Sequence, residues 1–568
     1  MGRFSRMGML FMAGILTVSF SACHSQPSGS SESPSSSGDS AAAGSGTTEG
    51  IHFTDYTVDS GLLSMWEEET ADSACLVQGI VCSPYFELKI NGETIPVYMA
   101  RTARGPHSFA YVEVQESGDK GDFLLNVEII TDAKRQNPIV LPESAGVTAR
   151  ADGNTVTASI ADYGSYTFTF DKSTYDDGSS LPLTLMIKPP EEVGDEGYAV
   201  HTFEPGEYRK ADLQLAESNT LYYFKKGEYT IDCIDILADN VTVYFEPGTL
   251  LIAKPLTLNE DGTPAAGSII RAEGRNNVKI IGHAALDLSF REVKAGTGVI
   301  LAFGGVKNLQ FAGLTVLNSC NWTCCFTNCE SVEIRDLLLL GYRTFSDGVL
   351  LSDCADVRVS GCFVRTGDDA MEVKSTSAGS VRTKNVVFEN NAVWTDKGIA
   401  YGAVYESNFD QSGVIWRNNS VGYALADWSQ HLGCVTVSMD GKDPAVQDHH
   451  LYFQDIEIYV SHCPVITVMM HNGGHIHDIF FRSIKAKEVV LNEAVFDHSI
   501  DLIITNEDEG PLTDFVLEDL YFDDIEYNGM ALTPENAATE IGRSFPDGYV
   551  FDEENIRVNT LDETASIP

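Results

Sequence analysis

The sequence predicts an all-β protein, built from an N-terminal antiparallel β-sandwich followed by a right-handed parallel β-helix. Two observations support this fold class. A short unit of alternating apolar residues recurs from about residue 240 onwards, and a different series of alternating segments fills residues 51–195. The repeating units show no convincing helical stripe, so strands account for both halves of the chain.

Residues 1–22 read as a signal peptide. Arg3 and Arg6 precede an apolar run of signal-peptide length, and Phe20-Ser-Ala-Cys23 ends in small residues. The ending resembles a bacterial lipobox, which implies cleavage before Cys23 and lipid attachment to its sulfur. A plain secretory signal with a chance cysteine is the alternative. Residues 23–50 are rich in Ser, Gly, Ala and Pro, and we expect a flexible tether.

Residues 51–195 alternate apolar and polar side chains in short segments separated by turn residues, as in an antiparallel sandwich. Tyr85-Phe-Glu-Leu-Lys-Ile and Phe109-Ala-Tyr-Val-Glu-Val are two such segments. A run beginning at Pro189 closes the region as a linker. We expect the sandwich to pack on the N-terminal end of the β-helix, covering an open sheet edge there.

Residues 196–568 are predicted to form the β-helix. Ten units begin with an Asn, Asp, Ser, His or Gly and continue as alternating apolar residues, 23 to 37 residues apart. Such a repeat indicates a solenoid whose turns bury their apolar edges against their neighbours. A propeller would need about 40 residues for each four-stranded blade. The units begin at Asn240, Asn277, Asn308, Ser331, Asp356, Asn385, Gly413, His450, Asp478 and Asp514.

The charge balance is strongly acidic. Only 37 Lys and Arg stand against 82 Asp and Glu, for a formal charge of −45 over 568 residues. Such a surface repels nucleic acid and anionic membranes, so we expect no nucleic-acid partner and membrane contact only through the N-terminal lipid. A neutral or cationic partner fits better than a polyanionic sugar chain. The sequence leaves the oligomeric state open.

Four of the twelve cysteines lie close together. They are Cys320, Cys324, Cys325 and Cys329, and they lack the CxxC pairs of a zinc site. We expect them at interior packing positions, where a free cysteine behaves as a small hydrophobe.

Three carboxylates stand out at the spacing of one coil. Asp347 precedes Gly348-Val-Leu-Leu, and Asp369 precedes Ala370-Met-Glu-Val 22 residues later, with Asp368 beside it. Equivalent positions in successive coils stack about 4.8 Å apart, so the acids are predicted to gather on one outer face. Carboxylates roughly 5 to 9 Å apart can work as general acid and base, and the larger separations predict inversion of configuration. The alternative is turn chemistry, because Asp-Gly and Gly-Asp-Asp also cap strands.

These motifs carry a resemblance. Ser346-Asp-Gly-Val and Thr366-Gly-Asp-Asp-Ala-Met-Glu-Val-Lys-Ser resemble the core of polygalacturonase-like glycoside hydrolases, families 28 and 49, whose fold is the pectin-lyase-like solenoid. The resemblance covers roughly residues 200–480. It implies that Asp368 protonates the leaving oxygen and that Asp347 and Asp369 share the base role.

The departures from that pattern bear on substrate. The Gly-His-Gly and Arg-Ile-Lys motifs of pectin-degrading members have no match, and Lys397-Gly-Ile-Ala-Tyr-Gly-Ala-Val-Tyr-Glu stands in their place. The run from Tyr401 looks more like dextranase-type family 49 members, which also carry an N-terminal sandwich. We therefore expect a neutral, α-glucan-like oligosaccharide or polysaccharide.

Residues flanking the acids are candidates for sugar binding. Aromatic rings can stack on sugars, and charged groups can bind hydroxyls, although core or rim packing suits each aromatic equally well. The candidates are Lys374, Trp394, Asp396, Tyr401, Tyr405, Asp427 and Trp428.

No cofactor or metal is predicted. His471-Asn-Gly-Gly-His475-Ile-His477 invites a metal interpretation, but its Gly-rich context fits a loop equally well. Two other functions stay open. A β-helix polysaccharide lyase would need a uronate substrate, and a non-catalytic surface protein would bind glycans without cleaving them.

Overall fold

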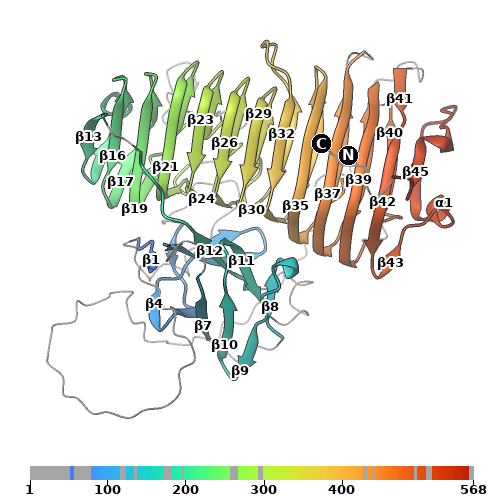
Figure 1. Cartoon of the computed structure of the whole chain (residues 1–568). Coiled ribbons are helices and arrows are strands. Elements are labelled where there is room, and N and C mark those ends of the chain that lie inside the picture. Colours follow the sequence, from blue (N-terminus) through green and yellow to red (C-terminus); the bar gives the residue numbers. More distant parts are fainter. Residues whose placement is uncertain are drawn as a thin grey trace, which may run out of the picture.

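The computed structural model describes residues 51–56, 79–115, 123–132, 137–170, 181–194, 197–255, 267–291, 299–425, 432–440, 443, 445–491, 496–506 and 514–561. These residues are folded almost entirely as strands, in a long solenoid with a smaller sandwich beside it (Figure 1). The predicted all-β parallel β-helix is confirmed. Among the described residues, no helix combines the length and apolar character needed to cross a bilayer.

The sandwich consists of two sheets facing one apolar core, which both sheets fill with alternate side chains. Neighbouring strands are antiparallel, except that β6 and β12 pair in parallel. The first sheet contains β1 (Ile51–Phe53), β2 (Val81–Cys82), β5 (Tyr98–Thr102), β6 (Gly105–Val114), β8 (Ile139–Leu141), β11 (Gly164–Thr169) and β12 (Leu183–Lys188). The second contains β3 (Phe86–Ile90), β4 (Glu93–Ile95), β7 (Leu125–Thr131), β9 (Arg150–Asp152) and β10 (Thr155–Ile160).

The solenoid has three faces of parallel strands around a continuous apolar interior. Long strands bend from the first face into the second, so both belong to one sheet. The first face contains β13 (Ala199–Phe203), β16 (Thr220–Phe224), β19 (Val241–Ala253), β21 (Asn276–Asp287), β23 (Lys307–Ala312), β26 (Glu330–Arg335), β29 (Ala355–Ser360), β32 (Lys384–Glu389), β35 (Gln411–Ala424), β37 (Gln447–Ser461), β39 (Gly474–Val489), β41 (Phe515–Leu517), β42 (Leu520–Tyr527) and β45 (Ile556–Val558).

The second face is completed by shorter strands, and the third forms a separate sheet. The second-face strands are β14 (Gly206–Tyr208), β17 (Gly227–Ile231), β24 (Thr315–Leu317), β27 (Leu338–Leu340), β30 (Phe363–Thr366) and β33 (Ala392–Thr395), with β43 (Met530–Ala531) antiparallel to β42 near the end of the solenoid. The third face contains β15 (Gln214–Leu215), β18 (Ile234–Ile236), β20 (Ile270–Glu273), β22 (Leu301–Gly304), β25 (Cys324–Thr327), β28 (Val349–Ser352), β31 (Met371–Ser375), β34 (Tyr401–Ser407), β36 (Val435–Asp440), β38 (Ile466–His471), β40 (Ile500–Thr505) and β44 (Ile541–Ser544). The helical pieces are short: α1 (Ala537–Glu540) and the 3₁₀ turns η2 (Glu143–Ala145), η4 (Lys210–Asp212) and η6 (Glu553–Asn555).

The repeat predicted from the sequence coincides with a turn that recurs in each coil. Every predicted unit from Asn240 to Asp478 begins at a residue with a positive φ of 52–65°, a conformation that Asn, Asp and Gly tolerate best. The last unit differs, because the turn lies at Asp519 rather than at the predicted Asp514. The stacked turns also bond to one another, since the Asn277 amide donates to Asn240 Oδ1 at 2.7 Å.

The sandwich lies along the flank of the solenoid, so the expected packing on its N-terminal end is wrong (Figure 1). Outward apolar residues of the second face, from β19 to β37, meet sandwich residues such as Tyr98 and Phe109 in one cluster. Leu317 and Phe363 are fully buried there. The second face thus carries its own apolar surface, and burying it outweighs covering the end of the stack.

The clustered cysteines are buried, as predicted. Cys320, Cys324, Cys325 and Cys329 are all buried and none is disulfide-bonded. Most of them pack in the solenoid interior.

A buried carboxyl cluster on the third face

Asp347 and Asp369 occupy equivalent positions in adjacent coils. Val349 of β28 pairs with Met371 of β31, and each acid precedes its paired residue by two positions. The two turns are held together, because the Gly348 N–H donates to the Asp369 carbonyl at 2.8 Å. The structure therefore brings these carboxylates to the same edge of the third face.

Asp368 lies in the same turn as Asp369, and hydrogen bonds fix both. Thr366 Oγ1 donates to the Asp368 carbonyl at 3.0 Å, and Asp368 Oδ1 accepts the Asp369 N–H at 3.0 Å. Asp369 Oδ1 accepts the Ile399 N–H of the next coil at 3.0 Å. The three aspartates are only 3–5% exposed, so they are buried groups rather than members of a solvated rim.

The glycines of the motifs are required by close backbone contacts. A Cβ on Gly348 would stand 2.2 Å from the Ala370 carbonyl oxygen, and one on Gly367 would stand 2.7 Å from the Arg343 carbonyl oxygen. A Cβ on Gly398 would lie 2.4 Å from the Asp368 carbonyl carbon. These coils pass too near one another for any side chain at these positions, which fixes the turns that carry the acids.

A fourth carboxyl, Glu372, belongs to the cluster and is absent from the sequence-based prediction. It is fully buried, and its carboxyl group interacts directly with those of Asp347 and Asp369. Lys374 Nζ lies 3.4 Å from Glu372 Oε2 and 3.1 Å from Glu406 Oε2. Strand alternation in the sequence could have predicted this position. Met371 and Val373 point inward, so Glu372 points outward, on the same side as Lys374.

Burial and mutual repulsion shift the pKa values in this cluster. Burial raises the pKa of Asp347 well above its usual range, and the negative charges of Glu372 and Asp368 add to that rise. Burial likewise raises the pKa values of Glu372 and Asp369, against the opposing charge of Lys374. For Lys374, burial acts to lower the pKa, but the surrounding carboxylates outweigh it and the pKa is raised well above its usual value.

This arrangement suits proton transfer. Several acids compete for few positive charges, so some stay protonated while others are ionised, which supplies a proton donor and a proton acceptor in one site. A single ammonium in their midst keeps part of the cluster anionic.

Among the predicted sugar-binding residues, Lys374 lies beside the acids and Tyr405 lies one position before Glu406. Lys374 is buried within the cluster, with its Nζ 5.2 Å from the centroid of the Trp322 ring. Tyr405 is part-buried next to Glu406, and its ring stacks on His471 at 5.7 Å. Trp322 and His471 were not among the sequence-based candidates for sugar binding.

Three other predicted residues lie elsewhere. Trp394 packs under the sandwich against His107, and Asp396 forms a two-pronged ion pair with Arg365 at 3.0 and 3.1 Å. Tyr401 is fully buried inside the solenoid, where its hydroxyl donates to the Ser420 carbonyl at 2.9 Å. Their predicted role as sugar-binding residues is wrong, because none of the three side chains faces the carboxyl cluster.

The remaining predictions fall outside the described residues. These are Asp427, Trp428 and the lipid-bearing Cys23. Around His471, the glycines form a turn between β38 and β39, and His475 lies 3.0 Å from Glu518 through its Nε2. Within the described ranges, no three His, Cys, Asp or Glu side chains are placed to hold a metal ion.

A large groove lies away from these acids, between the sandwich and the solenoid flank. We place the chemistry at the acids nonetheless, because four buried carboxyls around one ammonium are suited to proton transfer and a groove alone is not.

The part of the chain that contains the acid cluster is similar to known glycoside hydrolases. Residues 261–421, which include the whole cluster, match the model of glycosyl hydrolases family 28. A probable polygalacturonase of Vitis vinifera is 28% identical over 102 residues, which is 17% of this chain and 16% of that protein. The family match supports a glycoside hydrolase, as predicted. The finer resemblance to family 49 stays a prediction.

Solved structures with a similar chain path include an exopolygalacturonase of Thermotoga maritima, at 15% identity and a TM-score of 0.42, covering 63% of this chain and 94% of that one. The family 28 exopolygalacturonase of Yersinia enterocolitica has a TM-score of 0.37 at 13% identity, covering 68% and 97%. The catalytic domain of a family 87 α-1,3-glucanase in complex with nigerose has a TM-score of 0.38 at 11% identity, covering 83% and 87%.

Proposed function

We propose that the chain hydrolyses glycosidic bonds of a glycan at the cluster of Asp347, Asp368 and Asp369, with inversion of configuration. The observation that carries the proposal is the meeting of these aspartates at one edge of adjacent coils. The match to family 28 over the same residues supports the reaction class.

In this mechanism Asp368 donates its proton to the leaving oxygen as the bond from that oxygen to the anomeric carbon breaks. A water molecule attacks the anomeric carbon from the opposite face, and its proton passes to Asp347 or Asp369. The raised pKa values of Asp347 and Asp369 make them stronger bases than ordinary aspartates, provided they are ionised when water is bound.

A neutral glycan is the substrate class that the charges favour. Lys374, the cation inside the cluster, is already engaged by Glu372 and Glu406. A substrate carboxylate would have to compete with these glutamates and approach a protein of formal charge −45. Hydroxyl groups meet no such repulsion.

A uronic-acid polymer is the second candidate, favoured by one observation. Lys397 is half-buried in the turn whose Gly398 packs directly against Asp368 and Asp369. Lys397 therefore belongs to a turn that packs against the acids, and a substrate carboxylate bound at the acids would need a nearby cation of this kind. A lyase acting on the same polymer would release an unsaturated product.

The test is turnover on neutral and uronic oligosaccharides, followed by new reducing ends and by the anomer first formed in NMR spectra. We expect Asp368→Asn to lower kcat by about 10²–10⁴-fold, because the leaving group loses its acid. Asp356→Asn, a matched change at an exposed turn, should leave kcat unchanged.

Three outcomes would count against the proposal. Near-native turnover by Asp368→Asn would show that Asp368 is not the general acid. A first-formed product with retained anomeric configuration would show that the reaction is not a single displacement. Sugar binding without any product, by the native chain, would point to a non-catalytic glycan-binding protein.

We further propose an extracytoplasmic location with a lipid on Cys23, supported by the charged, apolar and small-residue pattern of residues 1–23. Native protein should partition with membranes, whereas Cys23→Ser should be released into the soluble fraction. Equal partitioning of both would contradict the lipid attachment.

A further inference from the structure

We infer that the groove between the sandwich and the solenoid is a second, non-catalytic binding site for a neutral oligosaccharide chain. The groove has a volume of about 1250 Å³, above the range of about 300–1,000 Å³ for sites that hold a single small molecule. An extended chain of several sugar units fits such a volume better than one small metabolite.

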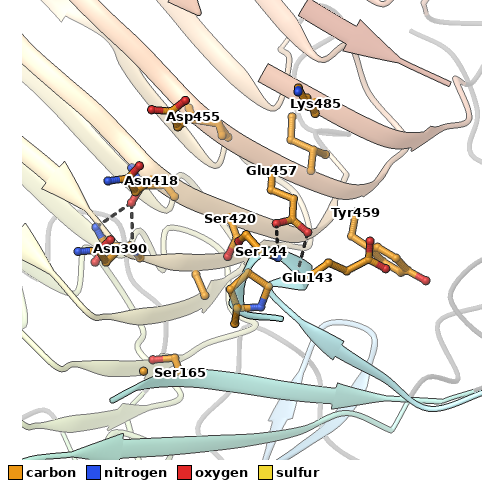
Figure 2. A pocket seen from close by; sticks show the side chains of 18 of the residues that line it. Glu143, Ser144, Ser165, Asn390, Asn418, Ser420, Asp455, Glu457, Tyr459 and Lys485 are labelled. Atoms are coloured by element: carbon orange, nitrogen blue, oxygen red, sulfur yellow. Dashed lines mark hydrogen bonds between the residues drawn. The ribbon is translucent and has the colours of Figure 1, made fainter. Parts of the chain in front are cut away.

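One wall of the groove is a row of turn residues from successive coils. Asn390, Asn418 and Asp455 occupy equivalent positions, because the residues that follow them pair from coil to coil. All three have a positive φ and are exposed, and Figure 2 shows them on neighbouring coils. The row repeats every 4.8 Å or so, the spacing of stacked strands and close to the length of one pyranose unit.

The amides of this row differ from those of the other turns. Elsewhere the stacked asparagines bond to one another, as Asn308 does to Asn277 at 2.7 Å and Asn385 to Asp356 at 2.8 Å. Within the described structure, the side chains of Asn390 and Asn418 make no such bond. The dashed lines beside their labels in Figure 2 join the adjacent residues Asn391 and Asn419. Asn390 and Asn418 therefore each offer an unused donor and acceptor to the groove, which is the pairing that sugar hydroxyls require.

The opposite wall comes from the sandwich. Tyr163 is half-buried there, with its hydroxyl donating to the Val114 carbonyl at 2.8 Å. That bond fixes the ring as an apolar surface beside Ser165. A fixed aromatic facing rows of amides and hydroxyls matches the two faces of a sugar ring, one apolar and one polar.

The cations that line the groove are each paired with a carboxylate, which disfavours an anionic ligand. At one end Lys188 Nζ lies 2.9 Å from Asp336 Oδ1. At the other end the Glu457 carboxylate accepts the N–H groups of Glu143 and Ser144, both at 2.9 Å, and Figure 2 shows this clamp. Recognition of an anionic sugar would need a free cation that these contacts do not provide.

The experiment measures binding of isomaltoheptaose, maltoheptaose and tri-galacturonate to the full chain by titration calorimetry. Asp368→Asn is the background, so that hydrolysis does not consume the probe. We expect one neutral probe to bind at two sites per chain. Adding Asn390→Gly and Asn418→Gly should weaken one site at least tenfold and leave the other unchanged.

Glycine is the chosen replacement because it keeps the positive φ without strain while removing the amide. Asn385→Gly is the matched control, with the same backbone conformation at a turn outside the groove, and it should keep both sites. Melting temperatures of the variants show whether each one is folded. With Asp368 left intact, the Asn390→Gly and Asn418→Gly variant should cleave a short substrate at the native rate.

The inference is overturned if no neutral probe occupies a second site, if both sites survive in the folded groove variant, or if tri-galacturonate fills the groove more tightly than the neutral probes. It stands apart from the proposed hydrolysis, because binding in the groove is measured without turnover. Groove binding with no hydrolysis by the native chain would overturn the proposed function alone.

Discussion

At the scale of single residues, Glu372 is the feature that distinguishes the acid cluster from a simple trio of aspartates. It is a buried carboxyl beside Lys374, and its charge is among the causes that raise the pKa of Asp347. It does not need to touch substrate to matter. A positioning residue of this kind acts through the protonation of its neighbours.

We expect Glu372→Gln to lower the pKa of Asp347, because it removes a negative charge next to that carboxylate. If Asp347 is the base, the acid limb of the pH profile of kcat/KM should move to lower pH. Glu406→Gln, at a side chain that is 45% exposed on the other side of Lys374, should move it much less. An unshifted acid limb in Glu372→Gln would show that the fourth carboxyl plays no part in the ionisation of the site.

At the scale of strands and turns, the alternation of apolar and polar residues predicted the coil repeat correctly. It did not predict the surroundings of the aromatic side chains. The units were recognisable because residues that tolerate a positive φ open nearly every one of them. Glu372 was also within reach of the sequence, since its neighbours Met371 and Val373 are plainly interior residues.

Alternation failed for Tyr401 and Trp394 for two different physical reasons. Tyr401 shares the inward parity of Met371, with which it pairs, so its ring belongs to the core. Trp394 does point out of the solenoid, but into the apolar contact with the sandwich. Alternation along a strand distinguishes side chains that point inward from those that point outward. It cannot distinguish an outward side chain that faces water from one that faces another domain.

The corner between the third and first faces contains a buried carboxyl, Asp448, whose ionisation should govern the stability of these strands. It accepts hydrogen bonds from Ser407 Oγ at 2.9 Å and Gln411 Nε2 at 3.2 Å, yet burial raises its pKa from 3.8 to about 7. A raised pKa means that the neutral form favours folding. This contribution is complete below pH 3.8 and is lost as the pH rises through about 7.

Asp448→Asn should remove that dependence, because asparagine stays neutral. We expect the variant to exceed the native chain in free energy of unfolding by about 2–4 kcal/mol at pH 8 and to match it near pH 4. Urea unfolding at both pH values measures the difference. The same gap at both would mean that Asp448 does not titrate in this range.

At the scale of the whole molecule, the sandwich and the solenoid share a buried polar contact as well as an apolar one. Arg365 of β30 is paired with Asp396, and its Nη1 lies 3.2 Å from Nδ1 of His107 in the sandwich. The guanidinium also lies 5.1 Å from the centroid of the Trp394 ring. This contact depends on each of its charged members being present.

Asp396→Asn should lower the free energy of unfolding by about 3–5 kcal/mol, because it leaves a buried guanidinium without its counter-charge. Denaturant unfolding measures the loss. Asp356→Asn, at an exposed position, should change stability by less than about 0.5 kcal/mol. Similar small losses in both variants would show that Arg365 finds compensation elsewhere.

The lateral position of the sandwich changes how such a stack responds to stress. A pure solenoid is a one-dimensional array in which each coil is stabilised only by its two neighbours, so local opening spreads from any weak point. The sandwich packs across the coils from β19 to β37, so it connects coils that are not neighbours in the stack. The coils that carry the four carboxyls lie within that braced stretch, so fraying at either terminus is kept away from the reacting groups.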